Sequence, residues 1–553
     1  MIRRGPQRIR CAAAAAILLA AGGRAPATEI PGREAPPSLV VVIVVDMLPS
    51  GKLESLRPLL SGGLRRMLDA GRVHASCAHA HASTLTAPGH ASLLSGMLPS
   101  RHGVIMNEWY DRDAHRVVYC VEDPGAASPG ADRPDRSPRN LLADGLADLI
   151  KDAHPQSLVY AVAAKDRSAI LSAGHRPDGA FWFDDARGGF TGDPDAIARL
   201  GDWKHEFFAR SPKTVPGALA RVPESWTYPQ RPEAHADDYP YETAPRAAPH
   251  DLGAGRGAGP EAARRRAKRI EHSPWMDRLT LDLAAQVLDD RRLGRDAAPD
   301  LLVVALGAAD FVGHRHGPDS QEYLDAIIRL DGWLSDFIER SERAAAVHGG
   351  AVFALSSDHG VLPLPELHPG GRRVDGAAMI ARLQSALTER LDPRSTTPFV
   401  EATQGGHVYL DRRALEAGGV PFDKAVEEAR RILLGFREVA RVYRAADLAP
   451  GEAGDVWLDL HRAAWHPQRG GDLVVQPCRG CLFTSRAEGT SHGTAYEYDR
   501  MVPLILMGRG VEPGSTDAAC RTIDLAPTLA GVLGLSFATP RDGRALPLAS
   551  GPR

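Results

Sequence analysis

Short, fully apolar, β-branched runs recur along the chain at wide intervals. Runs of this length without polar alternation are typical of strands buried on both faces, as in a parallel sheet covered by helices. Segments with helical periodicity, such as residues 275–288 and 323–340, lie between them. The alternation predicts an α/β fold with a central, mostly parallel sheet flanked by helices on both faces. The predicted strands are residues 39–45, 158–163, 301–306, 352–355 and 502–506.

Two segments break this pattern. Residues 231–266 are rich in Pro, Gly, Ala and charge, which predicts a surface insertion or a flexible linker. Residues 396–476 contain their own strand-like runs at 407–410 and 473–475 and a helical pattern at 422–434. We therefore expect one large catalytic-type domain over residues 38–548 that carries the 231–266 insertion and a smaller inserted subdomain at 396–476.

The N-terminus has the pattern of an export signal. Four arginines within the first ten residues precede a short apolar stretch at 11–21, and Ala25-Pro26-Ala27 supplies a small-residue cleavage site. The apolar stretch is shorter than the roughly 20 residues that a membrane span needs. We predict a signal peptide over residues 1–27, a periplasmic or secreted protein, and no stable membrane anchor. The alternative is an uncleaved, disordered tail.

Composition narrows the class of protein. With 553 residues and a hydrophobic fraction of 43%, the chain can bury a large core. The formal net charge is only -3 and no long basic run is present, which argues against nucleic acid as a partner. Removal of the signal would leave five cysteines, so at least one thiol is unpaired within the chain. For Cys478 and Cys481, a local disulfide is favoured over a redox pair or half of a zinc knuckle.

Carboxylates and imidazoles follow the predicted strands. Asp46 ends the first strand, and Asp358-His359 comes soon after the run at 352–355. Asp310 and His314 follow the run at 301–306, and His492 precedes the run at 502–506. Ligands of open α/β sheets bind outside the carboxyl ends of the strands, so these groups predict a metal site at that edge.

The spacing of these residues suits metal binding. Asp310 and His314 are four apart, so on a helix they point to one side. The adjacent Asp358 and His359 reach a common metal only from an irregular loop. The mixture of nitrogen and oxygen ligands suits zinc. Taken singly, each aspartate is typical of a helix cap or turn, and we expect the nearby His316 to lie at the surface.

A hydroxyl group opens a further predicted helix. In Ser83-Thr84-Leu85-Thr86-Ala87-Pro88-Gly89-His90, Thr86 begins a helix that runs through Leu94. A simple N-cap explains such a hydroxyl on its own. The same position lies at the positive end of the helix dipole, which favours an alkoxide and an incoming phosphate, and a nearby zinc would lower its pKa further. We interpret His90 as a packing residue or a residue that supports a ligand.

The ordered set resembles the alkaline phosphatase superfamily, in particular the branch of nucleotide pyrophosphatase/phosphodiesterases and phosphate-irrepressible alkaline phosphatases. The set consists of Asp46, T-x-P-G-H at Thr86, D-x-x-x-H at Asp310, D-H at Asp358 and H-G at His492, and the resemblance covers residues 39–507. The resemblance implies two Zn²⁺ per chain, with Thr86 as nucleophile and as a further ligand. One zinc is expected on Asp310, His314 and His492, and the other on Asp46, Asp358 and His359.

Three further residues bear on the substrate. Asn107 follows the nucleophile helix, and Lys165 and Arg167 form a K-x-R after the strand at 158–163. In this branch the equivalent groups bind phosphoryl oxygens. Two cations and an amide suit the dianion of a phosphate monoester, which has one more charged oxygen than a diester. The resemblance therefore implies small-molecule phosphate esters as substrates and a phosphothreonine intermediate hydrolysed by a metal-bound hydroxide.

Four alternatives stay open at this point. A phosphodiesterase or nucleotide pyrophosphatase uses the same two-metal core, as does a phosphonate hydrolase. A sulfatase is disfavoured, because its C/S-x-P-x-R motif is absent where Thr86-Ala87-Pro88-Gly89 stands. A metal-binding protein without catalysis would bind the metals and show no turnover.

Overall fold

The computed structural model describes residues 35–549 apart from 127–134, 209–215, 254–258 and 453. The predicted export signal at 1–27 lies outside the described residues. The described residues from Pro36 onward form one compact unit. Within the described ranges, no helix has both the length and the apolar character needed to cross a membrane.

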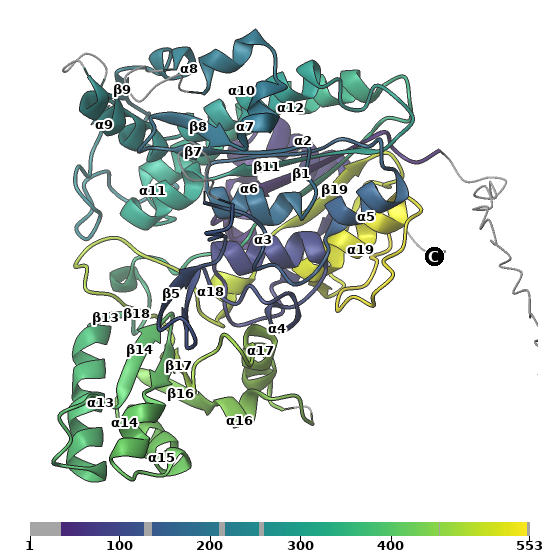
Figure 1. Ribbon diagram of the computed structural model, residues 1–553. Helices are drawn as coiled ribbons and strands as arrows, with labels where there is room; N and C mark the ends of the chain where they lie inside the picture. The colour runs from purple at the N-terminus through teal and green to yellow at the C-terminus, as the bar shows by residue number, and fades with distance from the viewer. Residues whose placement is uncertain (1–34, 127–134, 209–215, 254–258, 453, 550–553) are drawn as a thin grey trace, which may run out of the picture. The chain divides into compact units, whose positions relative to one another are not determined.

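A nine-stranded sheet organises the molecule, and its five inner strands β12-β1-β11-β6-β7 are parallel (Figure 1). The full order is β20-β2-β19-β12-β1-β11-β6-β7-β8. The expected central, mostly parallel sheet is therefore confirmed. The strands are β1 (Leu39–Val45), β2 (Arg72–His74), β6 (Val159–Ala163), β7 (Gly179–Asp184), β8 (Gly189–Gly192), β11 (Asp300–Leu306), β12 (Ala351–Ser356), β19 (Leu504–Gly508) and β20 (Gly514–Thr516).

The alternation of side chains along β1 explains why this strand is apolar throughout. Leu39, Val41 and Ile43 pack into a core with α2 (Gly63–Ala70), α10 (Trp275–Asp290) and α12 (Gln321–Ala345). Val40 and Val42 point to the other face. There they meet the core that α3 (Thr86–Ser95), α5 (Leu146–Ala153), α6 (Asp166–Ala173) and α19 (Leu525–Val532) complete. Helices thus cover both faces (Figure 1), and every residue of β1 is buried.

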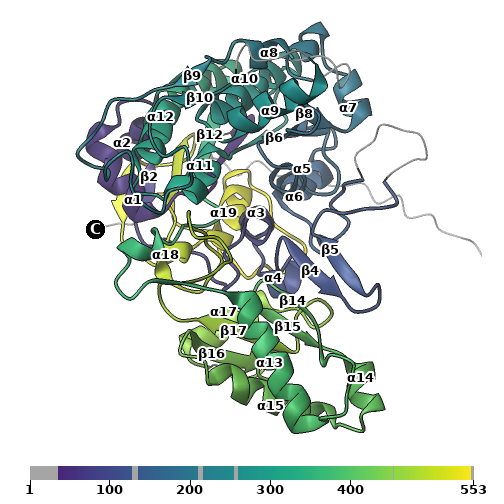
Figure 2. The ribbon, with the colours of Figure 1, turned by 90° about the vertical axis from the view of Figure 1, so that its left-hand side faces the viewer.

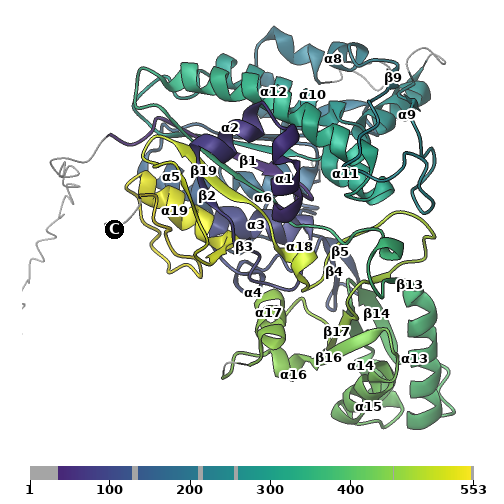
Figure 3. The same cartoon turned by 180° about the vertical axis from the view of Figure 1, so that it is seen from behind.

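Strand β19 runs antiparallel to its neighbours β12 and β2, and Figure 3 shows it beside β2. The start of an antiparallel strand lies at the edge where the parallel strands end. The segment before β19 therefore comes to the edge at which β1, β11 and β12 finish, and this segment contains His492.

A second sheet has a core of its own. Its strands are β14 (Val400–Gln404), β15 (His407–Leu410), β17 (Leu473–Pro477) and β16 (Val439–Arg444), in that order across the sheet. Helices α13 (Gly376–Leu391) and α15 (Phe422–Leu434) lie beside this sheet in Figure 2. Because Leu383 and Leu387 of α13 pack into the same core as Leu410 and Val475, this unit begins before residue 396.

The segment 231–266 makes defined contacts where it is described. Its β10 (His250–Asp251) pairs with β9 (Ser225–Trp226), and its last residues begin α9 (Pro260–Glu271). Glu242 is fully buried. The backbone N–H of Thr243 donates to Arg315 O at 2.7 Å, on α11 (Ala308–His316). The segment is thus attached to the helix that carries Asp310 and His314.

Small strand pairs complete the described fold. They are β3 (Cys77–Ala78) with β21 (Cys520–Arg521), β4 (Glu108–Asp111) with β5 (Arg116–Tyr119), and β13 (Arg372–Val374) with β18 (Cys481–Phe483). The predicted disulfide between Cys478 and Cys481 is present. Cys77, Cys120 and Cys520 are buried free cysteines.

Candidate metal centre and active site

The predicted metal ligands meet at the carboxyl edge of the inner strands. Asp310 Oδ1 lies 3.3 Å from His314 Nε2, 3.7 Å from His492 Nε2 and 3.9 Å from His359 Nε2. His359 Nε2 is also 3.2 Å from Asp358 Oδ2. Residues more than 180 positions apart are thus within one ligand shell, as the strand-end positions predicted.

Three buried carboxylate oxygens at this edge lack a hydrogen-bond donor: Asp46 Oδ2, Asp310 Oδ1 and Asp358 Oδ2. Of the three, only Asp46 Oδ2 has the Lys165 ammonium beside it. Buried oxygens of this kind nearly always have a partner, so their isolation indicates a cation between them and the imidazoles. The donor set of carboxylates and histidines fits zinc, as expected from the sequence.

Hydrogen bonds to the backbone fix the orientation of the three histidines. Nδ1 of His314 lies 2.9 Å from Thr490 O, that of His359 lies 3.0 Å from Gly360 O, and that of His492 lies 2.8 Å from Thr84 O. A carbonyl oxygen only accepts, so Nδ1 carries the proton in each ring. The lone pair is left on Nε2, which faces the carboxylates, and this is the usual support of a metal-bound histidine.

The donor atoms form two groups within 4.8 Å, one of Asp310, His359 and His492 and one of Asp46, His90 and Asp358. His90 Nε2 lies 3.2 Å from Asp46 Oδ1 and 3.8 Å from Asp358 Oδ2. His90 lies in the T-x-P-G-H motif and is not among the ligands that the resemblance implies, yet it contacts both carboxylates. His359 contacts carboxylates of both groups, so its assignment to the Asp46 zinc stays a prediction.

Lys165 joins the two groups electrostatically. It follows β6, and its Nζ lies 2.7 Å from Asp46 Oδ2 and 2.5 Å from Asp310 Oδ2. Burial alone would lower the pKa of Lys165, but the two carboxylates outweigh burial and raise it. Burial likewise favours a higher pKa for Asp46, yet Lys165 and then His90 lower that pKa to about 2. The ammonium and the carboxylates therefore keep their charges.

Thr86 does not serve as a helix cap. It is the first residue of α3, and the N-cap position belongs to Leu85, whose side chain makes no capping hydrogen bond. Its Oγ1 lies 3.5 Å from His359 Nε2 and accepts from Arg167 Nη2 at 3.4 Å. The capping interpretation is thus wrong for this hydroxyl, which is buried and faces a candidate ligand and a cation.

Asn107 and Arg167 reach the same helix end. Asn107 Oδ1 accepts from the backbone N–H of Ala87 at 2.8 Å. Because the carboxamide oxygen is held by α3, its NH₂ group remains to donate elsewhere. Arg167 also donates through Nη1 to Tyr119 Oη at 3.3 Å, which holds its guanidinium beside Thr86. Of the three side chains predicted to contact a phosphoryl group, Asn107 and Arg167 lie at the N-terminus of α3, and Lys165 lies among the carboxylates.

His316 is not a surface residue, contrary to the expectation. It is only 3% exposed. Side chains two positions apart on a helix point to nearly opposite sides. His316 therefore points away from the sheet edge that His314 faces.

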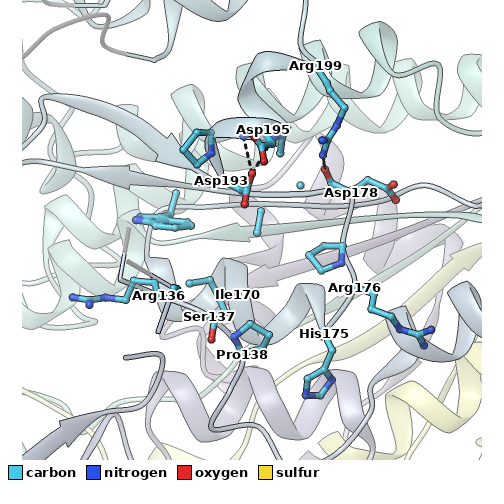
Figure 4. Close-up of a pocket in the computed structure, with 18 residues that line it drawn as sticks. Arg136, Ser137, Pro138, Ile170, His175, Arg176, Asp178, Asp193, Asp195 and Arg199 are labelled. Atoms are coloured by element: carbon cyan, nitrogen blue, oxygen red, sulfur yellow. Dashed lines mark hydrogen bonds between the residues drawn. The ribbon is translucent and has the colours of Figure 1, made fainter. Parts of the chain in front are cut away.

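Cavities lie on either side of the predicted residues. One of about 330 Å³ is lined by Lys165, Arg167 and Phe311. Another of about 900 Å³ is lined by Phe311, His314 and Thr490. A third cavity, of about 480 Å³ and shown in Figure 4, is lined by Ile170, His175 and Arg199 among others and contains none of the predicted site residues.

Comparison with known proteins identifies the family of this chain. The profile of the family described as Type I phosphodiesterase / nucleotide pyrophosphatase matches residues 40–499. The chain belongs to this family of phosphoryl hydrolases, and the resemblance to the alkaline phosphatase superfamily is confirmed.

Individual relatives point to one branch. Alkaline phosphatase PhoK of Sphingomonas sp is 30% identical over 535 residues, which cover 93% of this chain and 92% of PhoK. Alkaline phosphatase PafA of Elizabethkingia meningoseptica is 29% identical, over 92% of this chain and 93% of PafA. The crystal structure of wild type alkaline phosphatase PafA superposes with a TM-score of 0.82 at 27% identity, over 93% of this chain and 99% of that structure.

Proposed function

We propose that this enzyme hydrolyses small-molecule phosphate monoesters with two bound Zn²⁺ and a covalent intermediate on Thr86. The observation that carries the proposal is the convergence of Thr86, Asn107 and Arg167 on the N-terminus of α3, beside two groups of buried ligands. Zinc bound by those ligands would supply positive charge next to the attacking and leaving oxygens.

Different residues of the chain bind the phosphoryl group and attack it. Arg167 and the NH₂ group of Asn107 bind phosphoryl oxygens, and the N-terminus of α3 adds its dipole. The Thr86 oxygen forms a bond to phosphorus while the bond from phosphorus to the ester oxygen breaks, and the alcohol leaves with a proton. Water then displaces the Thr86 oxygen, which releases inorganic phosphate and restores the hydroxyl.

The choice of monoesters rests on charge and on the relatives. A monoester dianion carries one more negative charge than a diester, and Lys165 and Arg167 are two buried or part-buried cations at this site. Four relatives at 28–31% identity are named alkaline phosphatases. A solved PafA variant is altered at one threonine, one asparagine, one lysine and one arginine, and the lysine and arginine have the K-x-R spacing of Lys165 and Arg167.

A phosphodiesterase is the second candidate, because the family description includes that activity. The test compares hydrolysis of an aryl phosphate monoester with that of the matching diester by zinc-loaded protein. We expect the monoester kcat/KM to exceed the diester value by orders of magnitude. Arg167→Ala should lower the monoester rate far more than the diester rate. Measuring both rates for Lys165→Ala tests whether Lys165, the second cation at the site, contributes to the same preference.

Thr86→Ala separates catalysis from metal binding. We expect it to abolish turnover while zinc content stays at the wild-type value, and wild-type protein quenched during turnover should carry phosphate on Thr86 by peptide mass spectrometry. A faster diester reaction would assign the protein to the phosphodiesterases. Bound zinc without turnover of either substrate would contradict both proposals.

We also propose export to the periplasm or the medium, on the basis of the pattern at residues 1–27. The disulfide between Cys478 and Cys481 supports an oxidising compartment. Mass spectrometry of the protein from its native source should find a mature N-terminus at residue 28. A chain that retains residue 1 would contradict the proposal.

A further inference from the structure

A second cluster of metal-type side chains lies apart from the catalytic edge. It consists of Glu242 in the 231–266 segment, His316 at the end of α11 and Glu322 in the first turn of α12. One donor atom from each lies within 4.8 Å of the others. The two glutamates are fully buried, and His316 is 3% exposed. Three segments far apart in the chain thus bring two carboxylates and an imidazole into one interior space.

Several donor atoms of the cluster have no hydrogen-bond partner. These are both carboxylate oxygens of Glu242, Oε2 of Glu322 and Nδ1 of His316. Buried polar atoms are almost always paired, and four unpaired atoms facing one space are exceptional. Together they indicate a missing partner that accepts lone pairs from nitrogen and oxygen.

The charge of the cluster points in the same direction. Among the described residues, no lysine or arginine side chain forms an ion pair with Glu242 or Glu322, and the ion-pair contacts of both carboxylates are with histidines. The N-terminus of α12 stabilises a negative charge on Glu322, but Glu242 has no such support. A divalent cation would neutralise both carboxylates.

The distances suit a small transition-metal ion. Bonds of about 2.0–2.2 Å in a tetrahedral shell place neighbouring ligand atoms about 3.3–3.6 Å apart. His316 Nδ1 lies 3.5 Å from Glu242 Oε2 and 3.5 Å from Glu322 Oε1. We propose that Glu242, His316 and Glu322 hold a structural zinc or manganese ion in addition to the catalytic metals.

Two further histidines lie beside this shell. His250 Nε2 lies 2.9 Å from Glu322 Oε1, and His235 Nδ1 lies 3.4 Å from Glu242 Oε1 without forming a hydrogen bond to it. A contact such as that of His250 orients a carboxylate ligand in metal sites. Both histidines come from the 231–266 segment, and Figure 2 shows β10 beside α11 and α12. The ion would fasten that segment to the end of the helix that carries the catalytic ligand His314.

The first test is a crystal of the unaltered, metal-loaded protein measured on both sides of the zinc and manganese absorption edges. We expect an anomalous peak between Glu242, His316 and Glu322, at a position separate from any peak at Asp310. If the density between these three side chains shows no anomalous signal at either edge, or is that of a water molecule alone, the proposal is overturned. Peak positions keep this test independent of the phosphatase proposal.

Metal content provides a second test. The neutral double variant Glu242→Gln/Glu322→Gln should bind one metal equivalent less per chain than wild type by mass spectrometry of the purified protein. Asp325→Asn is the matched control, because Asp325 is also a buried carboxylate of α12 but bonds to Trp226 and Arg329. It should keep the wild-type metal content. An unchanged metal content in the folded double variant would contradict the proposal, and the crystal decides if that variant does not fold.

Discussion

Asn107 has two separable tasks at the start of α3. Its Oδ1 accepts from Ala87 N, and its NH₂ group is left for substrate. Asn107→Asp keeps an acceptor for the helix and loses the donor. We expect its melting temperature to stay near that of wild type, while kcat/KM for an aryl phosphate falls by at least about 10²-fold, as for loss of one donor to a transition-state oxygen.

The companion variant Asn107→Ala loses both tasks. It should show a similar fall in kcat/KM together with a loss of about 1 kcal/mol of stability from the missing cap. Full activity in the aspartate variant would show that the amide does not bind the phosphoryl group.

At the residue scale, the sequence indicates which residue types form the site better than it indicates which side chains contact each other. The order of Asp46, Thr86, Asp310 and His492 predicts which side chains meet, because strand ends share an edge. The position of Lys165 between two carboxylates and the burial of His316 depend on contacts between segments far apart, which no local pattern reveals.

At the scale of elements, α3 must approach the loop after β12 closely. A Cβ at Gly89 would lie 2.2 Å from the backbone oxygen of Asp358, so no side chain fits there. Gly89→Ala should push α3 and Thr86 away from Asp358 and His359. We expect a loss of about 1–3 kcal/mol from overpacking and a fall in kcat of about 10²-fold, measured by thermal unfolding and steady-state kinetics.

Gly51→Ala in α1 (Ser50–Leu56) is the matched control. A Cβ at Gly51 meets nothing within 4 Å, so this variant should keep full activity and unfold at the same or a higher temperature. Wild-type activity in Gly89→Ala would show that α3 can shift without displacing the nucleophile.

The start of β11 contains an aspartate whose ionisation opposes folding. Burial raises the pKa of Asp300 to about 6, although the N–H groups of Leu158 and Gly294 partly offset burial. The unfolded chain has a lower value, about 3.9. The stability from this group is therefore complete below about pH 4 and is lost as the pH rises through about 6.

Asp300→Asn removes this ionisation. The melting temperature of the variant relative to wild type should increase between about pH 4 and pH 7 and then level off, at a fixed zinc concentration. A difference that stays constant over that range would show that Asp300 is ionised throughout in the folded protein.

Element types follow from the sequence, but strand direction does not. The run at 502–506 is apolar throughout, so its pattern is the same whether β19 runs parallel or antiparallel. Only the pairing with β12 shows that it is antiparallel, and this direction brings His492 to the site. The start of the smaller unit at α13 is likewise hidden, because α13 joins that core only through contacts in the folded chain.

At the scale of the whole molecule, two cysteines connect the beginning of the domain with its end. Cys77 in β3 pairs directly with Cys520 in β21, and their Sγ atoms lie 2.8 Å apart in the interior. A small approach would allow a disulfide, since its bond length is about 2.05 Å. In an oxidising compartment an external disulfide oxidant would take up the two electrons and two protons that the thiols release.

We predict this second disulfide in the exported protein. Alkylation of the denatured, unreduced mature chain should modify Cys120 alone, and reduction should expose four more thiols and lower the melting temperature, because the bridge closes a loop of more than 400 residues. Protein made in a reducing cytosol should instead label at Cys77 and Cys520, and Cys120→Ala should remove the single thiol of the exported form. If Cys77 is labelled in exported protein while Cys478 is not, the Cys478–Cys481 disulfide has formed and the interior pair Cys77 and Cys520 has stayed reduced. That result would contradict the prediction.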